Sequence, residues 1–317
     1  MTAQTSSTAG AVPPTAPTGR VRTWASFVRL EHTLFSLPLI LAGIFTVPGP
    51  PMSLRRWALI AVAAVGARTA AMSLNRIIDR RLDARNPRTQ GRELPSGRMS
   101  GAEAWGLLAG STLAYLLACW ALDPATLFYL KVAPIPLGVF TVYPFLKRVT
   151  PLCHFGVGLG LALAPLAGWA AAHPSLAVPG PATWLALFAF FWVSGFDIIY
   201  ATLDEASDRA NGVHSMVVTL GRKRALMLSG ALHVLAFASL LVAVLHILEQ
   251  VLLAGASGAH FWPAMGVTLV LLVITAVLLL LEQTWAENVN LAFFKVNVWV
   301  GFVVLLATLA PRLAGAP

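Results

Sequence analysis

The chain has 317 residues, of which 57% are hydrophobic and 11% are charged, and its mean hydropathy is +0.75. Soluble globular domains contain roughly a quarter charged residues, so this composition excludes that class and indicates a polytopic membrane protein. The net charge is +9, but the basic residues lie in a few short loops. A nucleic-acid-binding protein would present them over a continuous surface, so no nucleic-acid partner is predicted.

The N-terminal segment differs from the rest of the chain. Residues 1–22 are rich in Thr, Ser, Pro and Ala and lack the apolar core of a signal peptide, so we predict a disordered cytoplasmic tail. Residues 23–317 are predicted to form one transmembrane domain. Cys119 and Cys153 lie in apolar segments and are too few for a disulfide framework, so we interpret them as core residues.

Nine apolar segments approach the length of about 20 residues that spans a bilayer. They lie at residues 25–47, 57–78, 103–122, 125–146, 152–172, 182–203, 225–248, 262–282 and 290–310. Proline-containing breakers such as VPGPP and LDPAT separate several of them. The expected fold is therefore all-α, a polytopic bundle of about nine transmembrane helices.

The loop charges predict the orientation in the membrane. One side receives Arg20, Arg22, Arg29, Arg80, Arg81, Arg85, Arg88, Arg92, Arg98, Lys147, Arg148, Arg209, Arg222, Lys223 and Arg224. The other side receives Arg55, Arg56 and Arg312. By the positive-inside rule, the N-terminus and the loops after the second, fourth, sixth and eighth helices are cytoplasmic, in a multi-pass protein of the cell (inner) membrane.

A polar stripe ends the second predicted helix. Asn75, Asp79 and Asp83 recur every fourth residue, and residues four apart on an α-helix differ by about 40° in direction. Their side chains therefore share one face. Arg68 lies seven residues before Asn75, on nearly the same face but deeper in the segment.

A second acidic stripe ends the sixth predicted helix, on the same side of the membrane. It contains Asp197, Asp204 and Asp208, and Tyr200 lies four residues before Asp204. One such cluster is equally typical of a solvated helix end with ion pairs. Two clusters together, with Asp197 and Arg68 inside apolar runs, favour a ligand site. Carboxylates suit Mg²⁺, which binds through one or two of them plus phosphate oxygens and water, so we predict a metal-bridged anion.

A third polar element is the stretch VYPFLKR. Tyr143 and Lys147 are four residues apart and can face the same cavity, and an ammonium group suits a diphosphate. The loop arginines Arg85, Arg88 and Arg92 are placed to cover that group. Taken alone, Lys147 and Arg148 are more typical of loop charges that set orientation. The seven histidines are scattered without metal-ligand spacing, and the nucleotide-binding glycine motifs are absent.

Together these motifs resemble those of the UbiA superfamily of intramembrane aromatic prenyltransferases. NRIIDRRLD is similar to the family's NxxxDxxxD motif, and DIIYATLDEASDRANGVHS to its second aspartate motif. RNPRTQGRELPSGR and VYPFLKR are similar to its loop and fourth-helix motifs. The similarity runs from about Trp24 to residues 292–297, with the motifs in the family's order. It implies about nine helices around a central cavity, where Mg²⁺ binds a polyprenyl diphosphate.

The resemblance also implies roles for individual residues. The expected metal ligands are Asn75, Asp79, Asp83, Asp204 and Asp208. The expected catalytic residues are Asp197, as a base or a further metal ligand, with Lys147 and Tyr143. The expected substrate-binding residues are Arg68, Arg88, Arg92, Arg29 and Tyr200, of which Arg68 or Arg29 would hold the acceptor's carboxylate.

The loop sequence bears on the acceptor. Arg92 is followed by Glu93-Leu94-Pro95, where the family often has Arg-Pro-Leu. With RLEHTLFSLPLILAG, this loop looks more like the 4-hydroxybenzoate prenyltransferase-like branch that is linked in some bacteria to menaquinone. The expected reaction is Mg²⁺-dependent prenylation of a hydroxyaromatic acid, 4-hydroxybenzoate, in ubiquinone or menaquinone synthesis. The alternative acceptor is 1,4-dihydroxy-6-naphthoate of the futalosine route.

Other classes fit the charge pattern less well. A secondary transporter for an anionic solute would show broken helices and charge near the bilayer midplane, whereas the acidic motifs here end helices on one side. A CDP-alcohol phosphotransferase would contain a DGxxAR motif, which is absent. A purely structural membrane protein does not account for four charged motifs on one side.

Overall fold

The computed structural model describes residues 1–317 except 1–18, 30–32, 50, 257–259, 287–288 and 316–317. The regular secondary structure of the described residues is helical, which confirms the predicted all-α class. The predicted tail, residues 1–22, lies outside the described residues as far as residue 18, and its last three residues belong to the first helix, α1 (Arg20–Phe27).

Eight helical segments of the described chain are long and apolar enough to cross a membrane. They are α3 (Leu54–Arg85), α4 (Gly101–Leu122), α5 (Phe128–Val132) with α6 (Pro134–Leu146), α7 (Cys153–Ala172), α8 (Gly180–Ala201), α11 (Arg222–Leu253), α12 (Phe261–Thr284), and α13 (Val289–Leu309) continued by η2 (Ala310–Gly315). The shorter helices are α2 (Thr33–Ile44), α9 (Glu205–Ala210) and α10 (Met216–Leu220). The chain is therefore an integral membrane protein, with α2 as the ninth helix of the bundle.

The first apolar segment differs from its prediction. Residues 25–47 are not one helix, because α1 ends at Phe27 and α2 begins at Thr33. Arg29, after α1, has a φ of 50°. This left-handed backbone is unfavourable for a non-glycine residue and cannot continue a right-handed helix. The hydrophobicity of the segment does not indicate this break.

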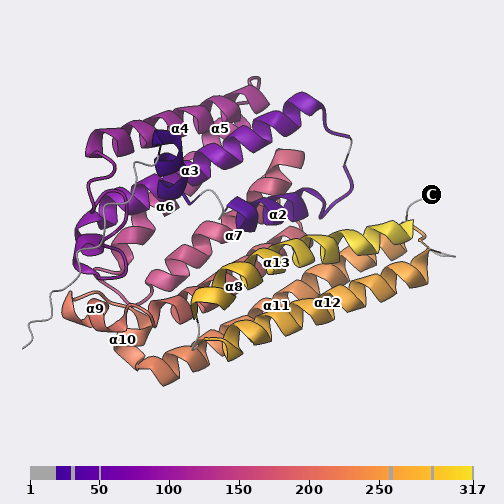
Figure 1. The fold of residues 1–317 in the computed structure, drawn as a ribbon. Helices are drawn as coiled ribbons and strands as arrows, with labels where there is room; N and C mark the ends of the chain where they lie inside the picture. The colour runs from indigo at the N-terminus through magenta and orange to yellow at the C-terminus, as the bar shows by residue number, and fades with distance from the viewer. Residues whose placement is uncertain (1–18, 30–32, 50, 257–259, 287–288, 316–317) are drawn as a thin grey trace, which may run out of the picture.

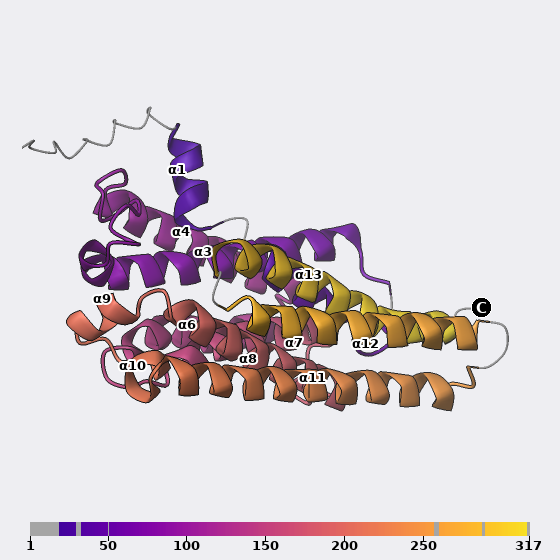
Figure 2. The same cartoon turned by 60° about the horizontal axis from the view of Figure 1, so that its bottom comes forward.

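The helices pack as neighbours around the bundle (Figure 1). Helix α3 contacts α4 and α6, α6 contacts α7, α7 contacts α8 and α2, and α8 contacts α11. Helix α12 packs on α13, and α13 returns to α2. Helices α9 and α10 lie at one end of the bundle, and the C-terminus lies toward the other (Figures 1 and 2). We call the end that contains α9, α10 and residues 86–100 the site end.

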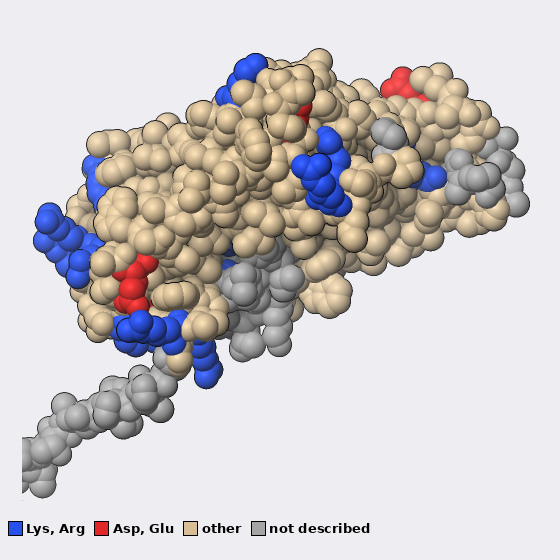
Figure 3. All heavy atoms as spheres, turned by 90° about the horizontal axis from the view of Figure 1, so that it is seen from above, with Lys and Arg blue, Asp and Glu red and all other residues tan. Residues whose placement is uncertain are grey.

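The outer surface of the bundle is apolar. Large side chains such as Trp105, Leu113 and Leu269 are more than half exposed, as expected for a surface in contact with lipid. One face of the molecule is largely uncharged, with Lys and Arg gathered in separate patches (Figure 3). Helix α3 shows the inverse pattern inside the bundle, since Asp79 is buried while Val62 is exposed.

Helix α3 brings its polar stripe to the site end. Its 32 residues extend about 48 Å at 1.5 Å per residue, which exceeds the roughly 30 Å hydrocarbon core. It ends at Arg85 and is capped by Asn86, whose extended backbone precedes Pro87, as the residue before a proline prefers. A capping box between Ser100 and Glu103 then starts α4. These two signals define the loop of residues 86–100.

Candidate active site

A polar cavity of about 310 Å³ lies at the site end, bounded by α3, α6, α7, α8 and the segments that follow α3 and α8. All the predicted site residues except Arg29 and Arg68 line it. They are Asn75, Asp79, Asp83, Arg88, Arg92, Tyr143, Lys147, Asp197, Tyr200, Asp204 and Asp208. Two acidic stripes more than a hundred residues apart in sequence therefore share one space.

On the α3 side, Asp79 is held by two cations. Lys147 Nζ lies 2.6 Å from Asp79 Oδ2, and an Arg148 guanidinium nitrogen lies 3.3 Å from Oδ1. Asn75 Nδ2 donates to the same carboxylate at 3.3 Å. Burial disfavours the charged ammonium, but attraction to Asp79 outweighs it and raises the pKa of Lys147. Paired in this way, a carboxylate that is 2% exposed can remain inside the bundle.

Arg148 has a larger role than its predicted contribution to orientation. Its guanidinium also donates to the carbonyl oxygens of Pro144, at 2.7 Å, and Ile78, at 2.9 Å. It therefore ties the end of α6 to α3 beside Asp79. The consecutive Lys147 and Arg148 act on one carboxylate, which a count of loop charges does not reveal.

On the opposite side, Asp204 is held by the loop that follows α3. Arg88 Nε donates to Asp204 Oδ1 at 2.8 Å, a second guanidinium nitrogen contacts Oδ2, and Asn86 Nδ2 donates at 2.7 Å. Burial opposes ionisation of Asp204, but these hydrogen bonds outweigh it and lower the pKa of its carboxyl group. Arg88 also donates to the Tyr200 hydroxyl at 2.7 Å and lies 4.6 Å from the ring centroid.

Two carboxylates of the cavity have unsatisfied capacity for a cation. Arg92 pairs with Asp83 Oδ1 at 2.7 Å, but Asp83 Oδ2 is buried and has no hydrogen-bond partner among the described residues. Burial, together with the negative charge of Asp204, raises the pKa of Asp208 to about 6. Both observations identify places where added positive charge would be stabilising.

The oxygen ligands fit Mg²⁺ bound together with a phosphate group. Within the described part of the chain, no three His, Cys, Asp or Glu side chains converge to form an all-protein metal site. Mg²⁺ does not need one, because it commonly binds through one or two carboxylates and completes its shell with phosphate oxygens and water. The orphaned oxygen of Asp83 and the stripes on two sides of the cavity match that mode.

His154 is a residue of the cavity that the sequence analysis did not single out. It is 3% exposed, and its Nδ1 lies 2.7 Å from Asp197 Oδ2. Its other nitrogen, Nε2, accepts a hydrogen bond from the backbone N–H of Met216 at 3.2 Å. A usable signal existed: His154 begins one apolar helix near the site end, and Asp197 lies near the site end of the next helix.

The two remaining predicted residues lie outside the cavity lining. Arg68 is half-buried on α3, and Arg29 is half-buried just after α1. Their assignment to the acceptor's carboxylate stays a prediction.

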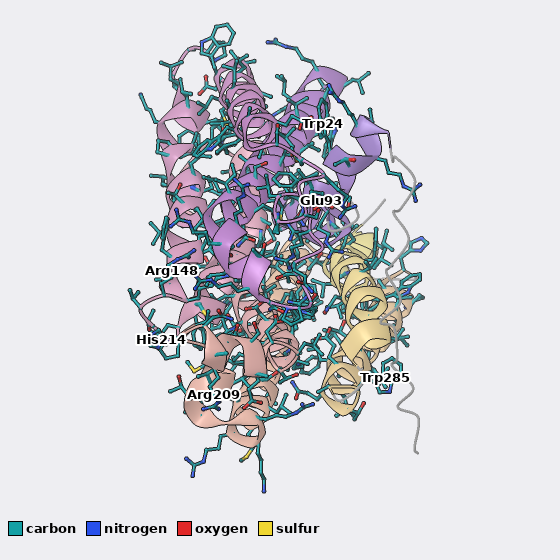
Figure 4. All side chains as sticks on the ribbon, turned by 60° about the vertical axis from the view of Figure 1, so that its left-hand side comes forward. Trp24, Glu93, Arg148, Arg209, His214 and Trp285 are labelled. Atoms are coloured by element: carbon teal, nitrogen blue, oxygen red, sulfur yellow. The ribbon has the colours of Figure 1, made fainter. Side chains whose placement is uncertain are left out.

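Glu93, the unusual residue of the loop, faces α1. It is 4% exposed and accepts a hydrogen bond of 2.6 Å from Ser26 Oγ, and Arg76 Nε donates to the carbonyl of Phe27 at 3.4 Å. Viewed onto the site end, Glu93 lies on the side of α1, whereas Arg148 and His214 lie on the other side (Figure 4). Glu93 therefore connects α1 to the loop that contains Arg88 and Arg92.

These features define an integral membrane bundle with a buried, charged cavity at one end. The chain belongs to the UbiA prenyltransferase family, whose model matches residues 36–305. The resemblance and the prenyltransferase class predicted from the motifs are thereby confirmed.

Individual relatives agree with this assignment. A UbiA homologue from Aeropyrum pernix K1 superposes with a TM-score of 0.74 at 31% identity, covering 87% of this chain and 96% of that one. A UbiA homologue from Archaeoglobus fulgidus bound to GPP and Mg²⁺ has a TM-score of 0.63 at 16% identity, covering 92% and 99%. A 4-hydroxybenzoate octaprenyltransferase from Psychrobacter arcticus is 29% identical over 275 residues, 81% of this chain and 80% of that protein.

Proposed function

We propose that this protein transfers a polyprenyl group from polyprenyl diphosphate to the ring of 4-hydroxybenzoate in quinone synthesis, with Mg²⁺ as cofactor. The observation that carries the proposal is the meeting of two acidic stripes with Lys147, Arg88 and Arg92 in one cavity. A diphosphate needs metal ligands and cations in one place. The name of the Psychrobacter relative and the ligands of the Archaeoglobus homologue support the same reaction.

The metal would be held from two sides. Asn75, Asp79 and Asp83 would bind it from α3, and Asp204 and Asp208 from the segment after α8. When bound, Mg²⁺ supplies charge neutralisation of the diphosphate. Arg88, Arg92 and Lys147 bind the same group through charge-assisted hydrogen bonds. These cations now pair with Asp204, Asp83 and Asp79, so substrate binding exchanges carboxylate partners for phosphate oxygens.

The residues of the cavity then favour transfer. The allylic C–O bond breaks and its electron pair leaves with the diphosphate, which the surrounding cations stabilise. An electron pair of the acceptor ring forms the new C–C bond. The ring carbon then loses its proton to Asp197, and the electrons of that C–H bond restore the aromatic ring. Tyr143 contributes a phenol to the wall, and the apolar bundle excludes water that would capture the allylic cation.

The proposed location is the inner membrane, with the N-terminus and the site end in the cytoplasm. The positive-inside bias of the loop charges supports this orientation. The polyprenyl tail, which is hydrocarbon, lies against the apolar helices or in the lipid beside them.

The test is a product assay with membranes that contain the protein. Radiolabelled polyprenyl diphosphate is incubated with Mg²⁺ and either 4-hydroxybenzoate or 1,4-dihydroxy-6-naphthoate, and products are separated by chromatography. A Mg²⁺-dependent prenylated 4-hydroxybenzoate supports the proposal, whereas transfer only to the naphthoate assigns the other acceptor. Failure with both acceptors, combined with anion uptake into proteoliposomes, would favour a transporter.

Matched variants connect the assay to the site. Asp79→Ala and Asp204→Ala should abolish transfer while the protein still inserts into the membrane. Retained turnover in either variant contradicts the two-sided metal site.

A further inference from the structure

His154 is held between two fixed partners in the wall of the cavity. It lies in the first turn of α7, with Nδ1 at 2.7 Å from Asp197 Oδ2 on α8 and Nε2 at 3.2 Å from the backbone nitrogen of Met216 on α10. The ring is 3% exposed. One imidazole therefore joins three helices at the point where they border the cavity.

The Met216 contact determines which ring nitrogen has the proton. A backbone N–H can only donate a hydrogen bond, so Nε2 must present its lone pair. In the neutral ring the hydrogen then lies on Nδ1, from which it is donated to Asp197. Because the lone pair of Nε2 is already used, His154 is not placed to accept a proton during the reaction.

Close packing of α7 against α8 fixes the position of the imidazole ring. Gly158, one turn after His154, lies against α8 so closely that a Cβ atom would collide with the Ser194 side chain and the Phe190 carbonyl. Ser194 lies three residues before Asp197, so the same helix contact sets the distance between His154 and Asp197. Met216 lies in the first turn of α10, where backbone N–H groups lack helical partners, and His154 satisfies one of them.

We propose that His154 is a positioning residue that orients the Asp197 carboxylate toward the aromatic acceptor. The inference rests on the proposed function and extends it. Asp197 lines the cavity, and its side chain is 27% exposed. His154 occupies Oδ2, and Oδ1 is the oxygen that receives the ring proton after the C–C bond forms. The proton on His154 Nδ1 stays in place throughout.

Three substitutions separate positioning from proton transfer. His154→Asn places its amide near the position of Nδ1, so its NH₂ group can donate to Asp197 while the Met216 contact is lost. His154→Leu has similar bulk and removes both bonds. His154→Gln places its amide near the position of Nε2, so its oxygen can accept from Met216 while the Asp197 contact is lost. His246→Leu, on the more exposed side of α11, is the matched control.

The expected pattern is a split between kcat and KM. His154→Leu and His154→Gln should lower kcat by about 10–100-fold, the usual effect of losing a residue that orients a reacting group. KM for the polyprenyl diphosphate should stay within about twofold, because the diphosphate residues are untouched. His154→Asn should stay within about threefold of the parent in kcat, since the hydrogen bond to Asp197 is kept. Adding His154→Leu to Asp197→Asn should cause no further loss.

The following results would contradict the inference. If His154→Asn is as impaired as His154→Leu, the imidazole itself transfers a proton or has another role. If His154→Leu and His154→Gln match the parent, orientation by His154 is unnecessary. Should His154→Leu not accumulate in membranes, His154→Asn and His154→Gln provide the same comparison. If the parent protein does not transfer a prenyl group, the proposed function is contradicted as well. If the parent is active and the His154 variants have the same kcat as the parent, only this inference is contradicted.

Discussion

Arg88 and Asp204, 116 residues apart in sequence, form a two-point ion pair between the loop after α3 and the segment after α8. The centroid of the Tyr200 ring lies 4.6 Å from the Arg88 guanidinium and stabilises its position by a cation–π contact. Both partners of the pair are predicted to bind substrate or metal. The pair therefore links the two walls of the cavity. A metal ion bound by Asp204 would release Arg88, and a phosphate group bound by Arg88 would release Asp204.

This coupling predicts a graded series at position 88. Arg88→Ala should raise KM for the polyprenyl diphosphate by about 10–100-fold, because a charge-assisted contact of about 1.5–3 kcal/mol is lost. Arg88→Lys keeps the charge but not the planar fork, so its effect should be intermediate. Initial rates over a range of polyprenyl diphosphate concentrations check the series. Equal KM values for Arg88→Lys and the parent would contradict recognition through the fork.

The second prediction separates two carboxylates of α3. Asp83→Asn should raise the Mg²⁺ concentration needed for half-maximal activity by about tenfold or more, because a metal ligand loses its charge. Its thermal stability should change little, since the amide oxygen can still accept from Arg92. Asp79→Asn should lower stability as well, because Lys147 and Arg148 both lose their ionic partner.

Mg²⁺ titration of activity and thermal unfolding in detergent measure the two effects. An unchanged Mg²⁺ requirement in Asp83→Asn would remove Asp83 from the metal site. Arg81→Ala, an exposed change on the same helix, is the control and should match the parent in both measurements.

The third prediction concerns the contact between Ser26 and Glu93. Ser26→Ala removes a 2.6 Å hydrogen bond to a buried carboxylate, which should cost about 1–3 kcal/mol. It should also increase tryptic cleavage at Arg22 and Arg29, because α1 loses its polar contact with the loop. Glu93→Gln retains an acceptor oxygen and should have a smaller effect. Limited proteolysis followed by mass spectrometry reports the cleavage, and identical digestion of Ser26→Ala and parent would contradict the role of this contact.

The parts of the fold that were predictable follow from local rules. Hydropathy and length identified the spanning segments, and the fourfold spacing of Asn75, Asp79 and Asp83 identified a shared helix face, because both depend on nearby residues alone. The Arg88–Asp204 pairing depends on how distant helices meet, which spacing does not encode. The sequence marked Glu93 as unusual, but its partner Ser26 became visible only in three dimensions.

The residues that were missed share a physical reason. His154 is one of seven histidines, and only its position opposite Asp197 distinguishes it. Arg148 resembles an orientation charge until its contact with Asp79 is known. The break between α1 and α2 depends on the backbone of Arg29, and an apolar run does not record where a backbone turns. In each case the missing information is a tertiary contact or a dihedral angle.

The last prediction tests the helix contact that sets the distance between His154 and Asp197. Gly158→Ala places a methyl group against the backbone of α8, where the Phe190 carbonyl cannot yield as a flexible side chain would. The helices must separate, at a cost of about 1–3 kcal/mol for overpacking. Because the shift lengthens the His154–Asp197 hydrogen bond, kcat should fall together with the unfolding temperature.

Gly160→Ala is the matched control, two residues further along α7. There an added Cβ would meet its nearest neighbour, the Phe140 ring, at 3.8 Å, which is ordinary van der Waals contact. This variant should keep the unfolding temperature and kcat of the parent. Comparing the pair by thermal unfolding and by prenyl transfer at saturating substrate tests the contact itself, because the substitution is the same on one helix. Equal behaviour of the two variants would mean that the α7–α8 approach at Gly158 does not position the catalytic carboxylate.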